Sequence, residues 1–168
     1  IGVFVINEVT TRAMASVTAR KGKNLAVKQV LSNILSQPAP DAGGLVAGTI
    51  EAFWIGQNQW MLCASFDSHE DIVGAFLNKF EGKASLTEQT DGWCRFSVEG
   101  PGLDQLCSLI CNINTRNFLP NVAVRTSIEH IGCFLLRLDA TTMHVLGPRS
   151  YAESLHHTLE TTAKSVVF

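Results

Sequence analysis

The pattern of apolar and polar positions along the chain predicts short strands, tight turns and helices. The segments GTIEAFWI and QWMLCAS are rich in β-forming residues, and Gly56-Gln57-Asn58 between them is typical of a hairpin. The next segment, SHEDIVGAFLNKF, predicts a helix with Ser68 as its N-cap and Asp71 at its third position. The apolar stripe of this helix consists of Ile72, Val73, Phe76, Leu77 and Phe80.

The same arrangement recurs near the end of the chain. CFLLRLDATTMHVLG predicts two strands with a turn at Asp139-Ala140, and SYAESLHHTLETTAKSV predicts a helix with Ser150 and Glu153 as a capping box. At an offset of 82 positions, the two arrangements align Met61 with Met143, Ser68 with Ser150, Asp71 with Glu153 and Leu77 with Leu159. A hairpin followed by a helix, used twice, predicts two ferredoxin-like halves, which we expect to share one sheet.

Between the two repeats lie a further strand and a further helix. The Asp91-Gly92 pair indicates a tight turn, after which apolar and polar residues alternate. The apolar positions of this strand are Cys94, Phe96 and Val98, and those of the following helix are Leu103, Leu106, Leu109 and Ile110. The order of elements predicts an α+β fold, with a mostly antiparallel sheet and helices on one side.

The amino-terminal part of the chain differs from the rest. Residues 24–35 predict a short amphipathic helix, and the segment QPAPDAGG after it is typical of a linker. We therefore divide the chain into an arm with a short helix and a linker, residues 1–44, and an α+β domain, residues 45–168.

Composition narrows the possible functions. The chain is 46% hydrophobic and 17% charged, with a mean hydropathy of +0.16. This excess of apolar residues fits a well-filled core or a surface that a partner subunit covers. The net charge of −2 and the lack of a basic stripe argue against nucleic-acid binding. No apolar run is as long as a membrane span, and IGVFVI is a poor signal peptide, so we expect a cytoplasmic protein.

The spacing of the cysteine and histidine residues does not predict a metal site. The five cysteines fit no zinc pattern and lie among apolar residues, so we expect reduced, buried thiols. His156 and His157 are adjacent on a predicted helix and point about 100° apart. His144 on the preceding strand could meet one of them, but we expect no bound metal.

A pattern spread over much of the chain resembles the γ subunit of heterotetrameric sarcosine oxidase. It covers about residues 45–165 and includes a hairpin with two tryptophans, a Thr-Asp-Gly turn and an Arg-Ser pair that opens the last helix. The matching positions are Trp54, Gly56, Trp60, Thr90, Asp91, Gly92, Gly100, Arg125, Thr126, Arg149 and Ser150. The resemblance implies the α+β fold of the first part of the folate-binding aminomethyltransferase, to which this γ subunit is similar.

The resemblance also addresses the segment IEHIGCFLLRLDAT, residues 128–141, in which Glu129, His130 and Cys133 together suggest an active site. In the folate enzymes, the corresponding strand brings acidic residues to the pterin and the amine after a glycine. Here that glycine is Gly132, and the acidic positions fall near Leu135 and Leu136. Leucine offers no ionisable oxygen, so we interpret the segment as a strand that keeps the fold and lacks the site. In this interpretation Cys133 has no base partner.

The resemblance therefore implies a non-catalytic accessory subunit of a flavin-containing complex that demethylates sarcosine or a related N-methyl amine. In such a complex FAD, FMN, NAD and tetrahydrofolate belong to partner subunits of the α, β and δ types, and this chain would brace the amine-oxidising and folate-binding subunits. Three alternatives stay open: a γ-like subunit of an N-methylglutamate or dimethylglycine dehydrogenase complex, a stand-alone folate-binding protein, and an enzyme that uses His130 or Cys133.

Candidate interface residues follow from these interpretations. Arg149 could hold an anion at a helix N-terminus, or pair with a carboxylate of a partner or of its own sheet edge. The tryptophans could be core residues or interface anchors. We select as candidate interface residues Trp54, Trp60, Trp93, Arg125 and Arg149.

Overall fold

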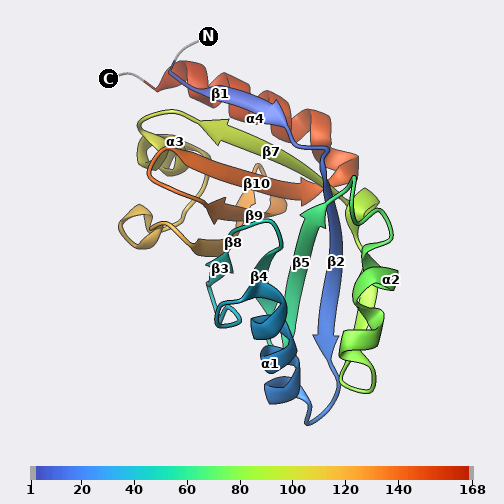
Figure 1. The fold of residues 1–168 in the computed structure, drawn as a ribbon. Helices are drawn as coiled ribbons and strands as arrows, with labels where there is room; N and C mark the ends of the chain where they lie inside the picture. The colour runs from blue at the N-terminus through green and yellow to red at the C-terminus, as the bar shows by residue number, and fades with distance from the viewer. Residues whose placement is uncertain (1–2, 167–168) are drawn as a thin grey trace. The chain divides into compact units, whose positions relative to one another are not determined.

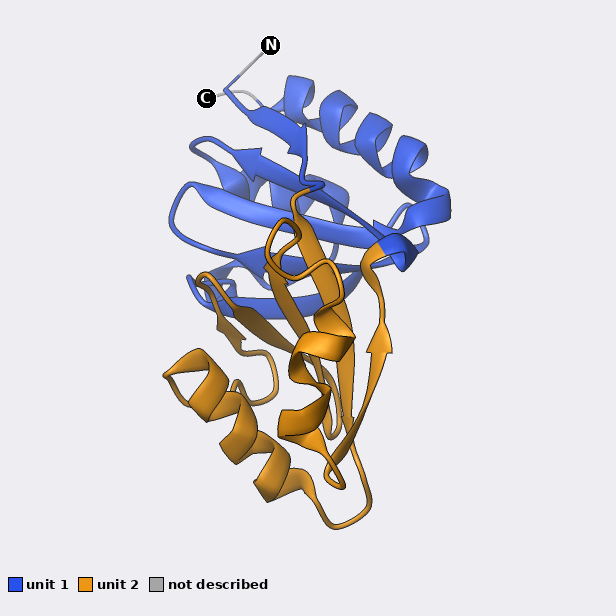
Figure 2. Cartoon of the chain, turned by 45° about the vertical axis from the view of Figure 1, so that its right-hand side comes forward, with its two compact units in different colours: residues 1–10, 91–168 blue, residues 11–90 orange. Residues whose placement is uncertain are grey.

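The computed structural model describes residues 3–166, which form an α+β structure of two compact units. Unit 1 combines residues 1–10 with residues 91–168, and unit 2 consists of residues 11–90 (Figure 2). Each unit contains an antiparallel sheet and its own hydrophobic core. No helix in the described part of the chain is long and apolar enough to cross a membrane.

Unit 2 has the strand order β3-β4-β5-β2-β6, with every neighbouring pair antiparallel. Its elements are β2 (Arg12–Ala19), α1 (Asn24–Leu35), β3 (Leu45–Val46), β4 (Glu51–Gly56), β5 (Gln59–Ser65), α2 (Ile72–Leu77) and β6 (Ala84–Glu88). Leaving out the short β3, the chain order is strand, helix, two strands, helix, strand, as in a ferredoxin-like unit. The expected hairpin is present between β4 and β5, with Trp54 opposite Trp60.

Unit 1 has the strand order β1-β7-β10-β9-β8, again antiparallel throughout. Its elements are β1 (Val5–Glu8), β7 (Trp93–Glu99), α3 (Leu103–Ile110), β8 (Val122–Ile128), β9 (Ile131–Arg137), β10 (Thr142–Pro148) and α4 (Ala152–Ser165). In unit 2, β2 lies between β5 and the edge strand β6, and β6 follows the second helix in the chain. In unit 1 the corresponding place next to β7 is taken by β1, from the other end of the chain (Figure 1).

In each unit, both helices pack on the same face of the sheet. In unit 1, alternate residues of β7 meet buried residues of α3 and α4, including Leu106 and Leu155. The expected core positions Cys94, Phe96 and Val98 are confirmed. In unit 2, one face of α1 is buried against the sheet, as the amphipathic pattern predicted.

The division of the chain differs from the sequence-based one. The structure contains two sheets, so the prediction that the halves share one sheet is wrong. Residues 1–44 do not form a separate arm, because β1 belongs to the sheet of unit 1 while β2 and α1 belong to unit 2. The boundaries instead fall near residues 10 and 90. The repeat of hairpin and helix is confirmed, since β4, β5 and α2 correspond to β9, β10 and α4.

The starts of α2 and α4 differ from the predicted ones, whereas α1 begins at Asn24 as predicted. Helix α2 begins at Ile72, and its N-cap is Asp71, whose carboxylate accepts a hydrogen bond from the Gly74 N–H at 2.8 Å. Ser68 is therefore not the cap. Helix α4 follows a single 3₁₀ turn, Arg149–Tyr151, so that Ser150 lies before the helix and no side chain caps it.

Two further details of α3 and α2 also correct the predicted faces. Leu109 is 59% exposed, and Cys107 is buried on the core face of α3 in its place. Leu77 of α2 is likewise half exposed, although Ile72, Phe76 and the following Phe80 are buried as predicted. Neighbouring leucines at a helix edge cannot be assigned to a face by spacing alone.

The cap of α2 gives a direct test of this local structure. Asp71→Ala should lower the free energy of unfolding by about 1 kcal/mol, because it leaves an N-terminal N–H of the helix unpaired. Ser68→Ala should change it by less than about 0.5 kcal/mol. Urea denaturation of both variants measures the difference. A larger loss for Ser68→Ala than for Asp71→Ala would show that the helix begins where the sequence pattern placed it.

Candidate functional site

The segment 128–141 contains the turn of the β8–β9 hairpin, strand β9 and the turn before β10. Ile128 of β8 lies opposite Ile131 of β9, and the two residues between them make the turn. Glu129 and His130 have φ angles of 48° and 67°, the combination of a type I′ turn. Both side chains are exposed at the tip of the hairpin. The acid and the imidazole of this segment are thus turn residues.

Cys133 is a core residue of β9. Its side chain is buried in the core of unit 1, and its Sγ lies 3.3 Å from the carbonyl of Ile131, to which it donates. Burial raises the pKa of Cys133 to about 11. The thiol therefore remains protonated at neutral pH, which makes it a poor nucleophile.

The positions of the expected acidic residues on β9 are filled by buried leucines. Leu135 and Leu136 are both 0% exposed, and Leu135 packs in the core of unit 1. These residues do not fit a folate or amine site that requires a carboxylate at this strand. Asp139, farther along, accepts a hydrogen bond from the Thr141 N–H at 2.8 Å, which lowers its pKa. Asp139 is exposed and serves the turn before β10, as predicted.

The three tryptophans occupy different environments. Trp60 is 1% exposed, and its Nε1 donates to the carbonyl of Pro40 at 2.8 Å. It is a core residue of unit 2 and not a surface anchor. Trp54 lies opposite it in the hairpin and is half-buried at the edge of the same core. Trp93 begins β7 in unit 1 and is also half-buried.

Two of the candidate residues meet at one side chain of unit 1. Phe134 of β9 contacts the Trp93 ring at a centroid distance of 5.6 Å, and the Arg125 guanidinium lies 5.9 Å from the Phe134 centroid. Arg125 sits on β8, an edge strand of the sheet, and its side chain is exposed. The aromatic ring beneath it restrains the guanidinium while leaving it accessible. We name Arg125, Phe134 and Trp93 the β8 cluster.

Arg149 pairs within its own sheet. Its Nη1 lies 2.5 Å from Oε1 of Glu8, the last residue of the edge strand β1. Of the expected roles, the pairing with a carboxylate of its own sheet edge is the one present. Both side chains are more than a third exposed, so the pair contributes at most about 1 kcal/mol to stability.

The histidines do not converge. The imidazole of His156 lies 5.4 Å from the Phe96 ring and 4.0 Å from the Glu160 carboxylate. His144 accepts a 2.7 Å hydrogen bond from Arg95 Nε and lies on β10 between core residues Met143 and Val145, so it points away from α4. Within residues 3–166, no group of three or more His, Cys, Asp or Glu side chains is arranged to hold a metal ion.

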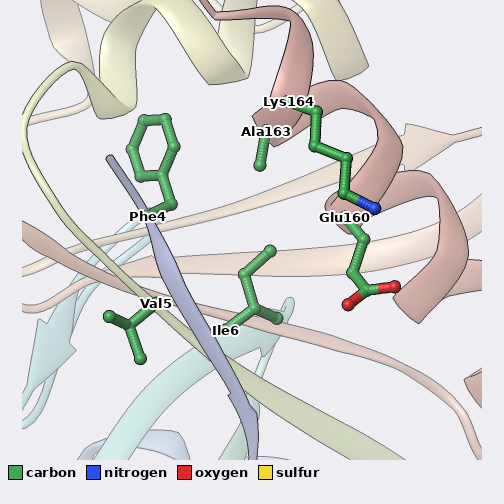
Figure 3. Close-up of a pocket in the computed structure, with 6 residues that line it drawn as sticks. All are labelled: Phe4, Val5, Ile6, Glu160, Ala163 and Lys164. Atoms are coloured by element: carbon green, nitrogen blue, oxygen red, sulfur yellow. The ribbon is translucent and has the colours of Figure 1, made fainter. Parts of the chain in front are cut away.

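One groove of unit 1 lies beside its edge strand. A groove of about 240 Å³ lies between β1 and α4, lined by Phe4, Val5, Ile6, Glu160, Ala163 and Lys164 (Figure 3). One wall is formed by the apolar side chains of Phe4, Val5 and Ile6, and the other by Glu160, Ala163 and Lys164 of α4. Such a lining suits contact with another polypeptide better than it suits chemistry.

Sequence reasoning missed Phe134, although a signal for it existed. A two-residue turn at positions 129 and 130 fixes the register of the hairpin, and this register places Arg125 opposite Phe134. The residue types of β8 and β9 alone, without the turn between them, do not indicate that Arg125 lies opposite Phe134.

Comparison with known proteins identifies the fold. No protein-family model matches the chain, and no curated protein matches it in sequence. A solved structure of heterotetrameric sarcosine oxidase from Corynebacterium sp. U-96, in complex with pyrrole 2-carboxylate, matches with a TM-score of 0.78 and 19% identity. The match covers 96% of this chain and 84% of that chain.

Two further structures share the fold less closely. Aminomethyltransferase T of the glycine cleavage system from Bartonella henselae matches with a TM-score of 0.68 and 10% identity over 94% of this chain, which spans 45% of that protein. The regulatory subunit of aspartate kinase from Thermus thermophilus matches with a TM-score of 0.51 and 14% identity, over 95% of this chain and 98% of that one. The α+β fold that the resemblance implied is thus confirmed.

The turn between β8 and β9 can be tested by substitution. His130→Gly should raise the free energy of unfolding by about 0.5–1 kcal/mol, because glycine adopts a positive φ without the steric cost that histidine bears. Glu129→Gln, which keeps the backbone preferences of a long side chain, should change it by less than about 0.5 kcal/mol. Urea denaturation provides the measurement. A destabilised His130→Gly variant would contradict the assignment of His130 as a turn residue.

Proposed function

We propose that this chain is a non-catalytic accessory subunit, of the γ type, in a flavin-containing complex that oxidatively demethylates sarcosine or a related N-methyl amine. The observation that carries the proposal is the fold match to a chain of heterotetrameric sarcosine oxidase, which covers most of both chains. The motif positions around Trp54, Asp91 and Arg149 support the same assignment.

The filled strand β9 supports a non-catalytic role. Buried Leu135 and Leu136 stand where the folate enzymes would carry acidic residues, and burial keeps the Cys133 thiol protonated. A chain with this fold, with leucines in place of the acidic residues, is suited to hold other subunits in place. Its apolar composition supports contact with such partners.

The proposed partners are α, β and δ type subunits, and FAD, FMN, NAD and tetrahydrofolate would belong to them. We propose that the complex is cytoplasmic and that this chain braces its amine-oxidising and folate-binding subunits. The exposed Arg125 of the β8 cluster and the groove between β1 and α4 are the surfaces of unit 1 that we assign to this contact. Both lie at edge strands, which are common sites of association.

Two other functions remain as outcomes of the experiment. The same chain could serve an N-methylglutamate or dimethylglycine dehydrogenase complex, because the substrate would be chosen by another subunit. A stand-alone folate-binding protein is favoured by the match to aminomethyltransferase T, but it is opposed by Leu135 and Leu136.

Gentle purification of the tagged chain from its source cells, followed by native mass spectrometry, tests the proposal. We expect two or three larger partners and the absorbance of bound flavin, and the partner sequences would identify the amine. A chain that emerges alone and colourless, and that binds tetrahydrofolate at micromolar concentration, would instead support the folate-binding function.

A single substitution tests the assigned surface. Arg125→Ala should weaken association with the partner subunits about fivefold or more, because exposed arginines held over aromatic rings often dominate interfaces. Arg20→Ala removes an exposed arginine of unit 2 and should leave association unchanged. The dissociation constant of the reconstituted complex, with circular dichroism to check folding, gives the comparison. Equal affinities for the two variants would remove Arg125 from the interface.

A further inference from the structure

Strand β1 is the outer strand at one end of the unit 1 sheet. It stands first in the strand order β1-β7-β10-β9-β8 and pairs with β7 on one side. The Val9 N–H donates to the Arg95 carbonyl at 2.7 Å, and these two residues lie opposite each other when the register of β1 and β7 is continued. In an antiparallel pair, hydrogen-bonded positions alternate with positions that are not bonded. The backbone groups of Ile6 and Glu8 therefore face away from β7.

The outer side of β1 has little of the protection that edge strands usually carry. Natural edges are blocked by lysine or proline, by a bulge, or by a covering segment. The sequence of β1, VINE, has neither lysine nor proline, and its register with β7 runs without a bulge. Its one charged residue, Glu8, is paired with Arg149. Val3 and Val5 are 41% and 57% exposed, so apolar surface accompanies the edge.

Helix α4 borders this edge and turns it into a groove. The helix runs alongside β1 (Figure 1), and the cavity of about 240 Å³ lies between the two elements. Phe4 belongs to the core of unit 1 and Ile6 packs against that core, so both side chains lie on the α4 side of β1 (Figure 3). A strand added to this edge would lie about 4.8 Å from β1. Its residues opposite Phe4 and Ile6 would point into the groove, because directly opposite residues share a face.

The outward backbone groups select an extended polypeptide as the occupant. A helix bonds its own backbone groups internally, so a helix docked here would leave those of Ile6 and Glu8 buried and unpaired. A small apolar ligand would do the same. An extended segment satisfies them by adding a strand to the sheet edge, as peptides do on PDZ domains.

The charges of α4 define the occupant further. Glu160 lies 4.0 Å from the imidazole of His156. Lys164, which lines the groove near the end of α4, forms no ion pair among residues 3–166. An acidic side chain of the added segment would complement Lys164, and the apolar side chains of the segment would complement Phe4 and Ile6.

We propose that β1 binds an extended segment of a partner subunit as a sixth strand of the unit 1 sheet. This inference rests on the proposed function and deepens it, because it specifies the contact made at the groove. The segment runs antiparallel to β1 and pairs with the backbone groups of Ile6 and Glu8. It carries apolar residues at alternate positions, whose side chains enter the groove, and an acidic residue beside Lys164.

Hydrogen exchange in the purified complex, resolved to single amides by mass spectrometry, tests the pairing. The N–H groups of Asn7 and Val9 face β7 and should exchange slowly in any case. With an added strand, the amides of Ile6 and Glu8 should exchange as slowly as that of Asn7. With an open edge, they should exchange at least about tenfold faster. Fast exchange at Ile6 and Glu8 in a complex with flavin-containing partners would overturn the inference and leave the proposed function intact.

Proline substitutions test the same edge by affinity. Ile6→Pro removes an outward N–H, at a kind of position where edge strands accept proline. It should weaken association with the partner subunits at least about fivefold more than Ile6→Ala, which loses the same side chain and keeps the N–H. Equal dissociation constants for the two variants, with circular dichroism showing that both are folded, would overturn the inference.

The edge strand β6 of unit 2 offers a matched control. The Gln89 N–H donates to the Met14 carbonyl in the continued register of β6 and β2, so the Leu86 N–H also points outward. Leu86 packs partly against the core of unit 2, as Ile6 does in unit 1. Leu86→Pro should therefore leave association unchanged. A loss as large as that of Ile6→Pro would show that the effect is not specific to β1, against the inference.

The composition of the purified assembly separates the remaining outcomes. Slow exchange at Ile6 and Glu8 in a complex whose partners carry no flavin would support the added strand and overturn the proposed function. Slow exchange in a dimer of this chain alone would make the occupant a second copy, which overturns the inference. A chain that emerges alone, with fast exchange at both amides, would overturn the inference and the proposed function together.

Discussion

The sheet of unit 1 depends on the pairing of β1 with β7. Four residues near the beginning of the chain, Val5–Glu8, supply its outer strand, and Ile6 lies opposite Val98. The pairing is continued by the bond from the Val9 N–H to the Arg95 carbonyl at 2.7 Å, and the Arg149–Glu8 ion pair ties the end of β1 to the start of the last helical segment. Without β1, the edge of β7 would be exposed beside α4, with its backbone groups unpaired.

The sequence predicted local structure better than long-range pairing. The strand of β7 and the hairpins follow from alternation and turn residues, which act over a few positions. The pairing of β1 with β7 joins positions far apart, and no local pattern encodes it. The predicted start of α2 was wrong because both Ser68 and Asp71 are good caps, and only the backbone geometry decides between them. The division at residue 44 failed for a related reason, since a proline-rich connection inside a unit has the composition of a linker between units.

For the candidate site, the sequence mainly predicted that the expected acidic residues are missing. Leucines at positions 135 and 136 indicated a strand without its acidic residues, and their complete burial agrees with a packing role. Sequence patterns did not indicate the β8 cluster. That cluster depends on the register of the β8–β9 hairpin.

The two ends of unit 2 lie side by side. The Met14 N–H donates to the Thr90 hydroxyl at 2.9 Å, and the Gln89 N–H donates to the Met14 carbonyl at 2.8 Å. These hydrogen bonds join the beginning and the end of residues 11–90. Unit 2 is therefore an insertion within unit 1, with adjacent ends of the kind that tolerate domain insertion and circular permutation. During synthesis, β1 leaves the ribosome well before its partner β7, whereas unit 2 has all its strands by residue 88. We therefore expect the sheet of unit 2 to form before β1 pairs with β7.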